Sequence, residues 1–205
     1  MDIPNQMKNE DQDLMDKHEL KKLIKGSYAD NDKAERIGHH LGLNLDKELS
    51  NNEQKVYIDK KGKPTIAFKG TNMFSPKDLY TDAALLFGLE SHTQRFQDSK
   101  KLVDAVHKKY GKATIVGHSL GGSLASASGS KKDHIVTVNK GVGIGGIGQK
   151  IKRNETDIRT VTDPISLLSL TQKHKGKNIT LPSSTILNPL KAHEWKNLKT
   201  LNGFV

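Results

Sequence analysis

Cysteine is absent from this 205-residue chain, and aromatic residues make up only 5% of it. Disulfide bonds are therefore excluded, and the redox compartment stays open. The longest apolar run, residues 83–89, is much shorter than the 18 or so residues that a membrane-spanning helix needs. The first residues also lack the basic and apolar regions of a secretory signal peptide. These absences predict a protein that is cytoplasmic or carried in a particle, rather than one exported by the usual route.

Acidic charge is scarce after the first quarter of the chain. The net charge is +10, but residues 1–50 carry 8 basic and 11 acidic residues, whereas residues 51–205 carry 25 and 12. A basic body can attract nucleic acid or a membrane surface rich in anionic lipid. The lysines are not interleaved with aromatic residues, as a nucleic-acid groove requires. We therefore expect no nucleic-acid partner, and we retain two interpretations: peripheral contact with an anionic membrane, or simply a solvated surface.

Hydrophobic periodicity alternates between helices and strands, and the length suits one domain. Helices are expected at residues 11–25, 32–41 and 93–110, with a closing helix from about residue 192; strands are expected at 56–59, 65–69, 113–116, 135–139, 158–161 and 179–181. This alternation predicts an α/β fold with a mainly parallel central sheet and helices on both faces. Residues 1–25 are acidic and lie outside the alternation, so an accessory N-terminal helix is one interpretation of them.

One stretch, residues 113–127, reads A-T-I-V-G-H-S-L-G-G-S-L-A-S-A. A short apolar run stops at Gly117, and small residues lead away from Ser119. This is the pattern of a nucleophile elbow, G-x-S-x-G, in which a serine occupies a strained turn between a buried strand and a helix. A Cβ atom at Gly117 or Gly121 would collide with neighbouring backbone. The alternative interpretation is a glycine-rich turn with an idle serine.

A serine hydroxyl becomes a nucleophile only when a base removes its proton, and the base needs an orienting carboxylate. On an α/β-hydrolase sheet the order along the chain is serine, acid, histidine. Asp163 follows the carboxyl end of the strand expected at 158–161, whereas Asp157 precedes it. His174 comes only 11 residues after Asp163, while His193 has 30 residues in which to return. We therefore predict Ser119, Asp163 and His193 as the catalytic residues.

An ester hydrolase also needs two backbone N–H groups directed at the developing oxyanion. One should come from Leu120, which follows the nucleophile, and the other from a loop after an earlier strand, where Gly70 and Thr71 are placed. The glycine-rich passage 141–148 contains G-x-G-x-x-G matches, but the residues after it are too short and polar for the helix that a dinucleotide site requires. Metal-ligand spacing is also missing. The sequence therefore predicts neither a cofactor nor a metal.

Several of these segments together resemble the class 3 lipase family of α/β-hydrolases. They are F-K-G-T (68–71), D-L-Y-T-D (78–82), G-H-S-L-G-G-S-L-A (117–125), T-D-P-I-S (162–166) and A-H-E-W (192–195). The resemblance implies the same roles for Ser119, Asp163, His193, Thr71 and Leu120, and no triad role for His118. The sequence departs from the family pattern at Lys69, where an arginine is usual, and at Ser166, where a proline is common.

The resemblance implies hydrolysis of a lipid carboxylic ester through an acyl-serine intermediate, with triacylglycerol, monoacylglycerol and phospholipid all open as substrates. By the same resemblance, residues 71–82 form either a lid over the nucleophile or a fixed surface loop. The alternative function is a catalytically silent hydrolase-fold module that binds lipid or a protein partner. The sequence predicts no oligomeric state.

Overall fold

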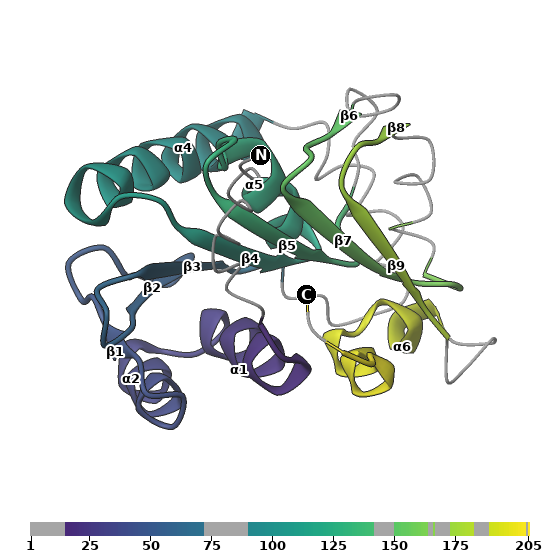
Figure 1. The fold of residues 1–205 in the computed structure, drawn as a ribbon, viewed down its shortest axis with the longest axis horizontal. Helices are drawn as coiled ribbons and strands as arrows, with labels where there is room; N and C mark the ends of the chain where they lie inside the picture. Colours follow the sequence, from purple (N-terminus) through teal and green to yellow (C-terminus); the bar gives the residue numbers. More distant parts are fainter. Residues whose placement is uncertain are drawn as a thin grey trace, which may run out of the picture.

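The computed structural model describes residues 15–71, 90–141, 150–163, 166, 173–182, 189–203 and 205. Its centre is a seven-stranded sheet in the order β1-β2-β3-β4-β5-β7-β9 (Figure 1). The strands are β1 (Asn44–Leu45), β2 (Gln54–Ile58), β3 (Pro64–Phe68), β4 (Thr114–His118), β5 (His134–Val138), β7 (Glu155–Thr160) and β9 (Lys177–Leu181). A separate parallel pair joins β6 (Lys150–Ile151) to β8 (Lys173–His174).

Five neighbouring strands, from β3 to β9, run parallel, and β1 and β2 continue the sheet antiparallel. The predicted α/β fold with a mainly parallel sheet is confirmed. In register, Phe68 of β3 lies beside Gly117 of β4, and His118 lies beside Val138 of β5. The carboxyl ends of three central strands therefore meet at one edge, which is where open α/β sheets bind ligands.

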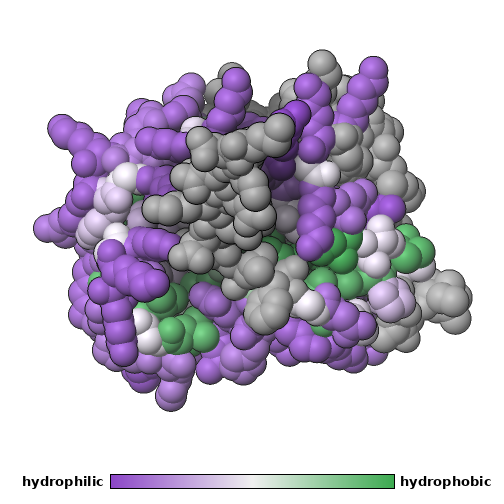
Figure 2. Space-filling view, in the orientation of Figure 1, coloured by the Kyte–Doolittle hydropathy of each residue, from purple (hydrophilic) through white to green (hydrophobic). Residues whose placement is uncertain are grey.

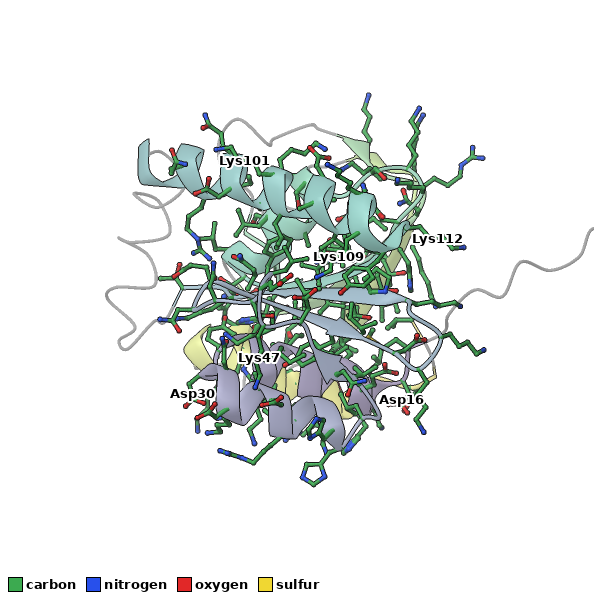
Figure 3. The ribbon with its side chains drawn as sticks, turned by 90° about the vertical axis from the view of Figure 1, so that its left-hand side faces the viewer. Asp16, Asp30, Lys47, Lys101, Lys109 and Lys112 are labelled. Carbon is green, nitrogen blue, oxygen red and sulfur yellow. The ribbon has the colours of Figure 1, made fainter. Side chains whose placement is uncertain are left out.

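Helices cover both faces of the sheet, as predicted, and the three layers are visible edge-on in Figure 3. One face carries α4 (Glu90–Tyr110) and α5 (Leu120–Ser128); the other carries α1 (Lys17–Ser27), α2 (Asn31–His39), α6 (Pro189–His193) and the 3-10 helix η3 (Trp195–Thr200). Successive side chains of a strand alternate between the faces. Thus Ile115 of β4 packs in the α4–α5 core, while Val116 packs in the core beneath α1 and η3.

The N-terminal helix α1 belongs to the packed core. The Asp16 side chain caps it by accepting hydrogen bonds from the backbone N–H groups of His18 and Glu19, at 2.7 and 2.8 Å. Its apolar stripe, Leu20, Leu23 and Ile24, is buried against the sheet. The part of residues 1–25 that the structure describes is therefore no appendage, because burying this stripe removes apolar surface from water.

The two ends of the described chain meet. The N–H of Met15 donates to the carbonyl of Val205, and the N–H of Val205 donates back to Met15, both at 3.0 Å. This pairing brings the start of α1 next to the segment that follows η3. Much of the described surface in Figure 2 is hydrophilic, with smaller apolar areas between the polar side chains. None of the helices in the described residues is long and apolar enough to cross a membrane.

The structure corrects the prediction of a closing helix that starts near residue 192. His193 instead ends the short helix α6, Glu194 is extended, and η3 follows. The cause is Asn197, whose side-chain amide donates to the carbonyls of Lys191 and Ala192, at 2.7 and 3.0 Å, and so ends α6. The two-residue strands β1, β6 and β8 were not predicted. The lid interpretation and the glycine-rich passage fall mostly on residues 72–89 and 142–149, which lie outside the described residues.

Candidate active site

Ser119 stands between β4 and α5 in a strained backbone conformation, with φ 56° and ψ −126°. Residues other than glycine rarely adopt a positive φ, and such strain persists only where the surroundings enforce it. The enforcing contact on one side is the hydrogen bond from the Ser119 N–H to the carbonyl of Val138, at 3.0 Å. The predicted strain at this serine is therefore confirmed.

Glycine is required on both sides of the serine. A Cβ atom built on Gly117 would lie 2.1 Å from the carbonyl oxygen of Gly121, and one built on Gly121 would lie 2.3 Å from that of Phe68. Both obstacles are backbone atoms, which cannot turn aside as a side chain can. The two glycines thus let β3, β4 and α5 approach closely around Ser119.

The backbone N–H groups predicted for an oxyanion lie next to the elbow. Leu120 is the first residue of α5, and no side chain caps that helix, so its first turn directs N–H groups and the positive end of its dipole toward this edge. Gly70 approaches from β3: a Cβ atom on it would lie 3.3 Å from the Cβ of Ser119. Thr71, which follows Gly70, is half-buried. The structure therefore brings the 70–71 segment and Leu120 together around the serine.

Asp163 and His193 form a buried pair. The Nδ1 atom of His193 lies 3.0 Å from each carboxylate oxygen of Asp163, and the side chains are 5% and 0% exposed, respectively. The N–H of Ser166 also donates to Asp163, at 3.2 Å. On the far side of the ring, the Nε2 atom of His193 is buried and has no hydrogen-bond partner among the described residues.

Asp157 and His174, the alternatives for the acid and the base, lie in other surroundings, as does His107. Asp157 lies inside the sheet on β7 and accepts a hydrogen bond from Thr137 at 2.7 Å. His107 is paired with Asp133 at 2.7 Å, and Asp133 also accepts from the N–H of Ala113. His174 falls in β8, and its side chain lies outside the described residues.

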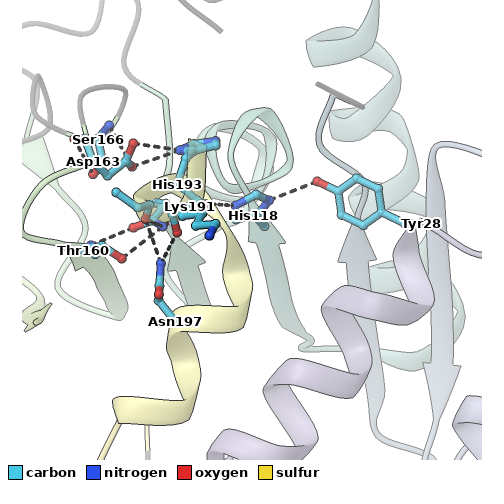
Figure 4. A network of polar contacts seen from close by, with 10 residues as sticks. Tyr28, His118, Thr160, Asp163, Ser166, Lys191, His193 and Asn197 are labelled. Carbon is cyan, nitrogen blue, oxygen red and sulfur yellow. Dashed lines mark hydrogen bonds and ion pairs between the residues drawn. The ribbon is translucent and has the colours of Figure 1, made fainter. Parts of the chain in front are cut away.

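Two further side chains hold the main chain of His193, and sequence reasoning assigned a role to neither. The Nε2–H of His118 donates to the carbonyl of His193 at 2.7 Å (Figure 4). The Asn139 amide donates to the same oxygen at 3.0 Å. The rings of His118 and His193 are 4.9 Å apart. Because His118 immediately precedes Ser119, these contacts bring the Asp163–His193 pair to the elbow. The sequence signal for Asn139 is an asparagine directly after a strand, and its φ is indeed 45°.

Burial controls the charge of His118. The loss of solvent, and next the nearby charge of His193, lower the pKa of His118 to about 3. The ring is therefore neutral at ordinary pH and carries one N–H, which the carbonyl of His193 requires on Nε2. Its Nδ1 must then accept, and the Tyr28 hydroxyl lies 3.1 Å away as the donor. Burial also raises the pKa of Tyr28, which keeps that proton in place.

Arg95 supplies a guanidinium near the position where Lys69 departs from the lipase pattern. Its Nη2 donates to the carbonyl of Lys69 at 2.9 Å and pairs with Glu53 at 2.6 Å. Arg95 comes from α4, so the Lys69 backbone is held by a residue 26 positions away. Among the residues that the structure describes, no group of three or more histidine, aspartate or glutamate side chains is placed to hold a metal ion.

Comparison with family models assigns the chain to the phospholipase-like proteins, a class that indicates lipid-ester hydrolysis. The matching model is described as the Tle-like phospholipase domain and covers residues 15–140. More than half of the chain is matched, so the chain belongs to this family. The match supports a lipase-like family without singling out the class 3 lipases. It includes Thr71, Ser119 and Leu120 and stops before Asp163 and His193. No curated protein matches the chain.

Proposed function

We propose that this protein is a serine hydrolase of the α/β-hydrolase fold, of the class 3 lipase type, that cleaves carboxylic esters of phospholipids. The observation that carries the proposal is the strained Ser119 elbow beside the buried Asp163–His193 pair. The family match supports a lipid substrate and favours phospholipid over triacylglycerol or monoacylglycerol.

In the proposed acylation step, Ser119 Oγ attacks the ester carbonyl carbon while its proton passes to Nε2 of His193. Nε2, which has no partner among the residues that the structure describes, is the ring nitrogen that remains after Nδ1 has bound Asp163. Asp163 holds the ring in the tautomer that leaves the Nε2 lone pair free and stabilises the imidazolium that forms. The tetrahedral oxyanion accepts hydrogen bonds from the N–H groups of Thr71 and Leu120.

Collapse of the tetrahedral intermediate breaks the bond to the alcohol oxygen, which leaves with the proton from His193 Nε2. The products at this point are the acyl-serine and a free alcohol, here a lysophospholipid that keeps its acyl chain at the position not cleaved. A water molecule then gives its proton to His193 and attacks the acyl carbon, and the fatty acid is released as Ser119 recovers its proton. No cofactor takes part in these steps.

The partners that we propose are the lipid ester and, through the basic body of residues 51–205, an anionic membrane surface. The experiment that tests the function is fatty-acid release from phospholipid micelles and from a soluble short-chain ester. Ser119→Ala should lower kcat by about 10⁶, and His193→Ala should be comparably severe. His174→Ala, the matched histidine control, should stay within about twofold of the wild type.

A fluorophosphonate probe should label wild-type protein at Ser119 and leave Ser119→Ala unlabelled, because the probe reacts only with an activated hydroxyl. If His174→Ala is severe and His193→Ala mild, the assigned base is wrong. Wild-type protein that binds phospholipid but neither hydrolyses it nor reacts with the probe would be a silent lipid-binding module.

A further inference from the structure

A line of hydrogen bonds runs from the end of α1 to the segment that carries His193. The Tyr28 hydroxyl lies 3.1 Å from His118 Nδ1, and His118 Nε2 lies 2.7 Å from the carbonyl of His193 (Figure 4). Three parts of the chain meet here: Tyr28 closes α1, His118 precedes the proposed nucleophile, and His193 ends α6. The interactions are thus non-local, and they span the proposed site from one side to the other.

The direction of each hydrogen bond follows from the acceptors. A carbonyl oxygen can only accept, so His118 must carry its proton on Nε2. A neutral ring then has a lone pair on Nδ1, and the Tyr28 O–H is the donor that satisfies it. The titratable groups that act on His118 are His193 and Asp163, together with the Tyr28 hydroxyl at Nδ1. Burial makes the neutral form of His118 the stable one beside them.

Tyr28 also reaches the other side of the proposed site. The backbone N–H of Gly70 hydrogen-bonds to its hydroxyl, and a Cβ atom on Gly70 would lie only 2.4 Å from that oxygen. Gly70 precedes Thr71, the residue assigned to the oxyanion. One hydroxyl group therefore contacts the backbone before the proposed oxyanion donor and, through His118, the backbone of the proposed base.

We propose that Tyr28 and His118 are positioning residues: the tyrosine hydroxyl holds the His118 ring by donating to its Nδ1, and His118 in turn fixes the main chain of His193, so that Nε2 of the base is directed at Ser119. The inference rests on the proposed function and adds two residues that touch neither the substrate nor the reacting atoms. Asn139, the second donor to the same carbonyl, restrains the position of that carbonyl but not the ring of His118.

Tyr28→Phe is the first test, since it removes only the hydroxyl. Without the donor at Nδ1 the His118 ring is held at Nε2 alone, and the His193 segment loses part of its anchoring. Misplacement of a catalytic group by about 1 Å can lower a rate about a hundredfold, so we expect kcat for a soluble short-chain ester to fall by about 10–100-fold. KM should change by less than about twofold, and the rate of fluorophosphonate labelling should fall in parallel with kcat.

Tyr57→Phe is the matched control. Tyr57 is fully buried, and its hydroxyl donates to the carbonyl of Ala34, at 3.4 Å, away from the site. Both variants lose one tyrosine hydroxyl, so both should show similar, small decreases in melting temperature. Only Tyr28→Phe should lose turnover. Equal kcat values in Tyr28→Phe, Tyr57→Phe and wild type would overturn the proposal.

Two substitutions of His118 test its two hydrogen bonds separately, and they test the proposal even if Tyr28→Phe does not fold. A glutamine amide reaches about as far as Nε2 and can donate to the carbonyl of His193, whereas an asparagine amide reaches about as far as Nδ1 and can only meet Tyr28. His118→Gln should therefore keep at least about ten times the kcat of His118→Asn, with similar melting temperatures. The reverse order, or equal values, would contradict a role through His193.

The failure of this proposal differs from the failure of the proposed function. If the wild type is neither labelled nor active, Ser119 is not an activated nucleophile and both proposals fall. If the wild type is active, Ser119→Ala is inactive and the Tyr28 and His118 variants match their controls, the hydrolase stands and the positioning role alone is wrong.

Discussion

His118 couples the charge state of one residue to the stability of the fold. Its pKa is about 3 in the folded protein because the ring is buried beside His193, against about 6.5 for histidine in an unfolded chain. Between these values the unfolded chain binds a proton that the folded protein does not. The contribution of His118 to stability is therefore fully present above pH 6.5 and is lost as the pH falls from 6.5 toward 3.

We expect the free energy of unfolding of the wild type to fall more steeply with acid than that of His118→Gln, which has no proton to bind at this position. The difference in slope should approach about 1.4 kcal/mol per pH unit between pH 6 and pH 4, and should vanish above pH 7.5. Urea unfolding at a series of pH values measures both slopes. Parallel curves through the acid range would mean that His118 titrates normally in the folded protein.

Residues that lie in a sequence motif could be predicted, whereas residues whose partners are distant in the sequence could not. The glycines around Ser119 predict its strained turn, and chain order and loop length predict that Asp163 pairs with His193; the structure shows both features, and the catalytic roles stay predictions. Tyr28 and Arg95 gave no signal, because their partners are 90 and 26 positions away. A tyrosine at the end of a helix is ordinary until the fold brings His118 against it.

At the scale of elements, the sequence predicts long helices and strands better than short ones. Long strands and helices could be predicted because their apolar periods extend over several residues. The two-residue strands are too short to show a period, and the break between α6 and η3 depends on a side-chain donor, Asn197, rather than on a change in apolar period. The sequence therefore predicted the scaffold better than the segment that presents His193.

The junction of β4 and α5 depends on close approach of the two backbones, and Gly117→Ala tests it. The new Cβ atom would meet the backbone of α5 at 2.1 Å, so the helix must move away from β4, and we expect a loss of at least about 3 kcal/mol in stability. Gly62→Ala is the control: it has φ +79° but no atom within 4 Å, and should lose only the backbone strain of about 1–2 kcal/mol. Chemical denaturation compares the two. Similar losses in both variants would show that α5 is free to shift.

At the scale of the whole molecule, positive charge gathers at the end of the sheet opposite to Ser119. Exposed basic residues precede the amino ends of the five parallel strands of the seven-stranded sheet. One of them, Lys112, is labelled in Figure 3. They include Lys60, Lys61, Lys112, Lys131, Lys132, Arg153 and Lys175. Some lie next to helix C-termini, where a positive charge complements the helix dipole. Because Ser119 follows the carboxyl end of β4, attraction through these residues would not direct the serine toward a membrane.

The double substitution Lys131→Glu with Lys132→Glu should weaken binding to anionic vesicles at least about tenfold at low salt, since each basic residue near such a surface contributes about 1 kcal/mol. Hydrolysis of a soluble ester should stay within about twofold of the wild type. Lys25→Glu with Lys33→Glu, which changes the net charge equally on α1 and α2, is the control. Equal loss of binding in both pairs would assign the attraction to net charge, and salt should abolish it in either case.

The pairing of Met15 with Val205 has a consequence for the time at which the protein becomes active. During synthesis the strands β2–β5 and Ser119 leave the ribosome before the residues that carry His193 and Val205, and folding proceeds in that order. The contacts that join Met15 to Val205 have a large sequence separation, so they form late. A nascent chain thus holds the nucleophile of the proposed hydrolase without its base. Such an enzyme would leave the lipids of the cell that makes it untouched until the segment that carries His193 folds.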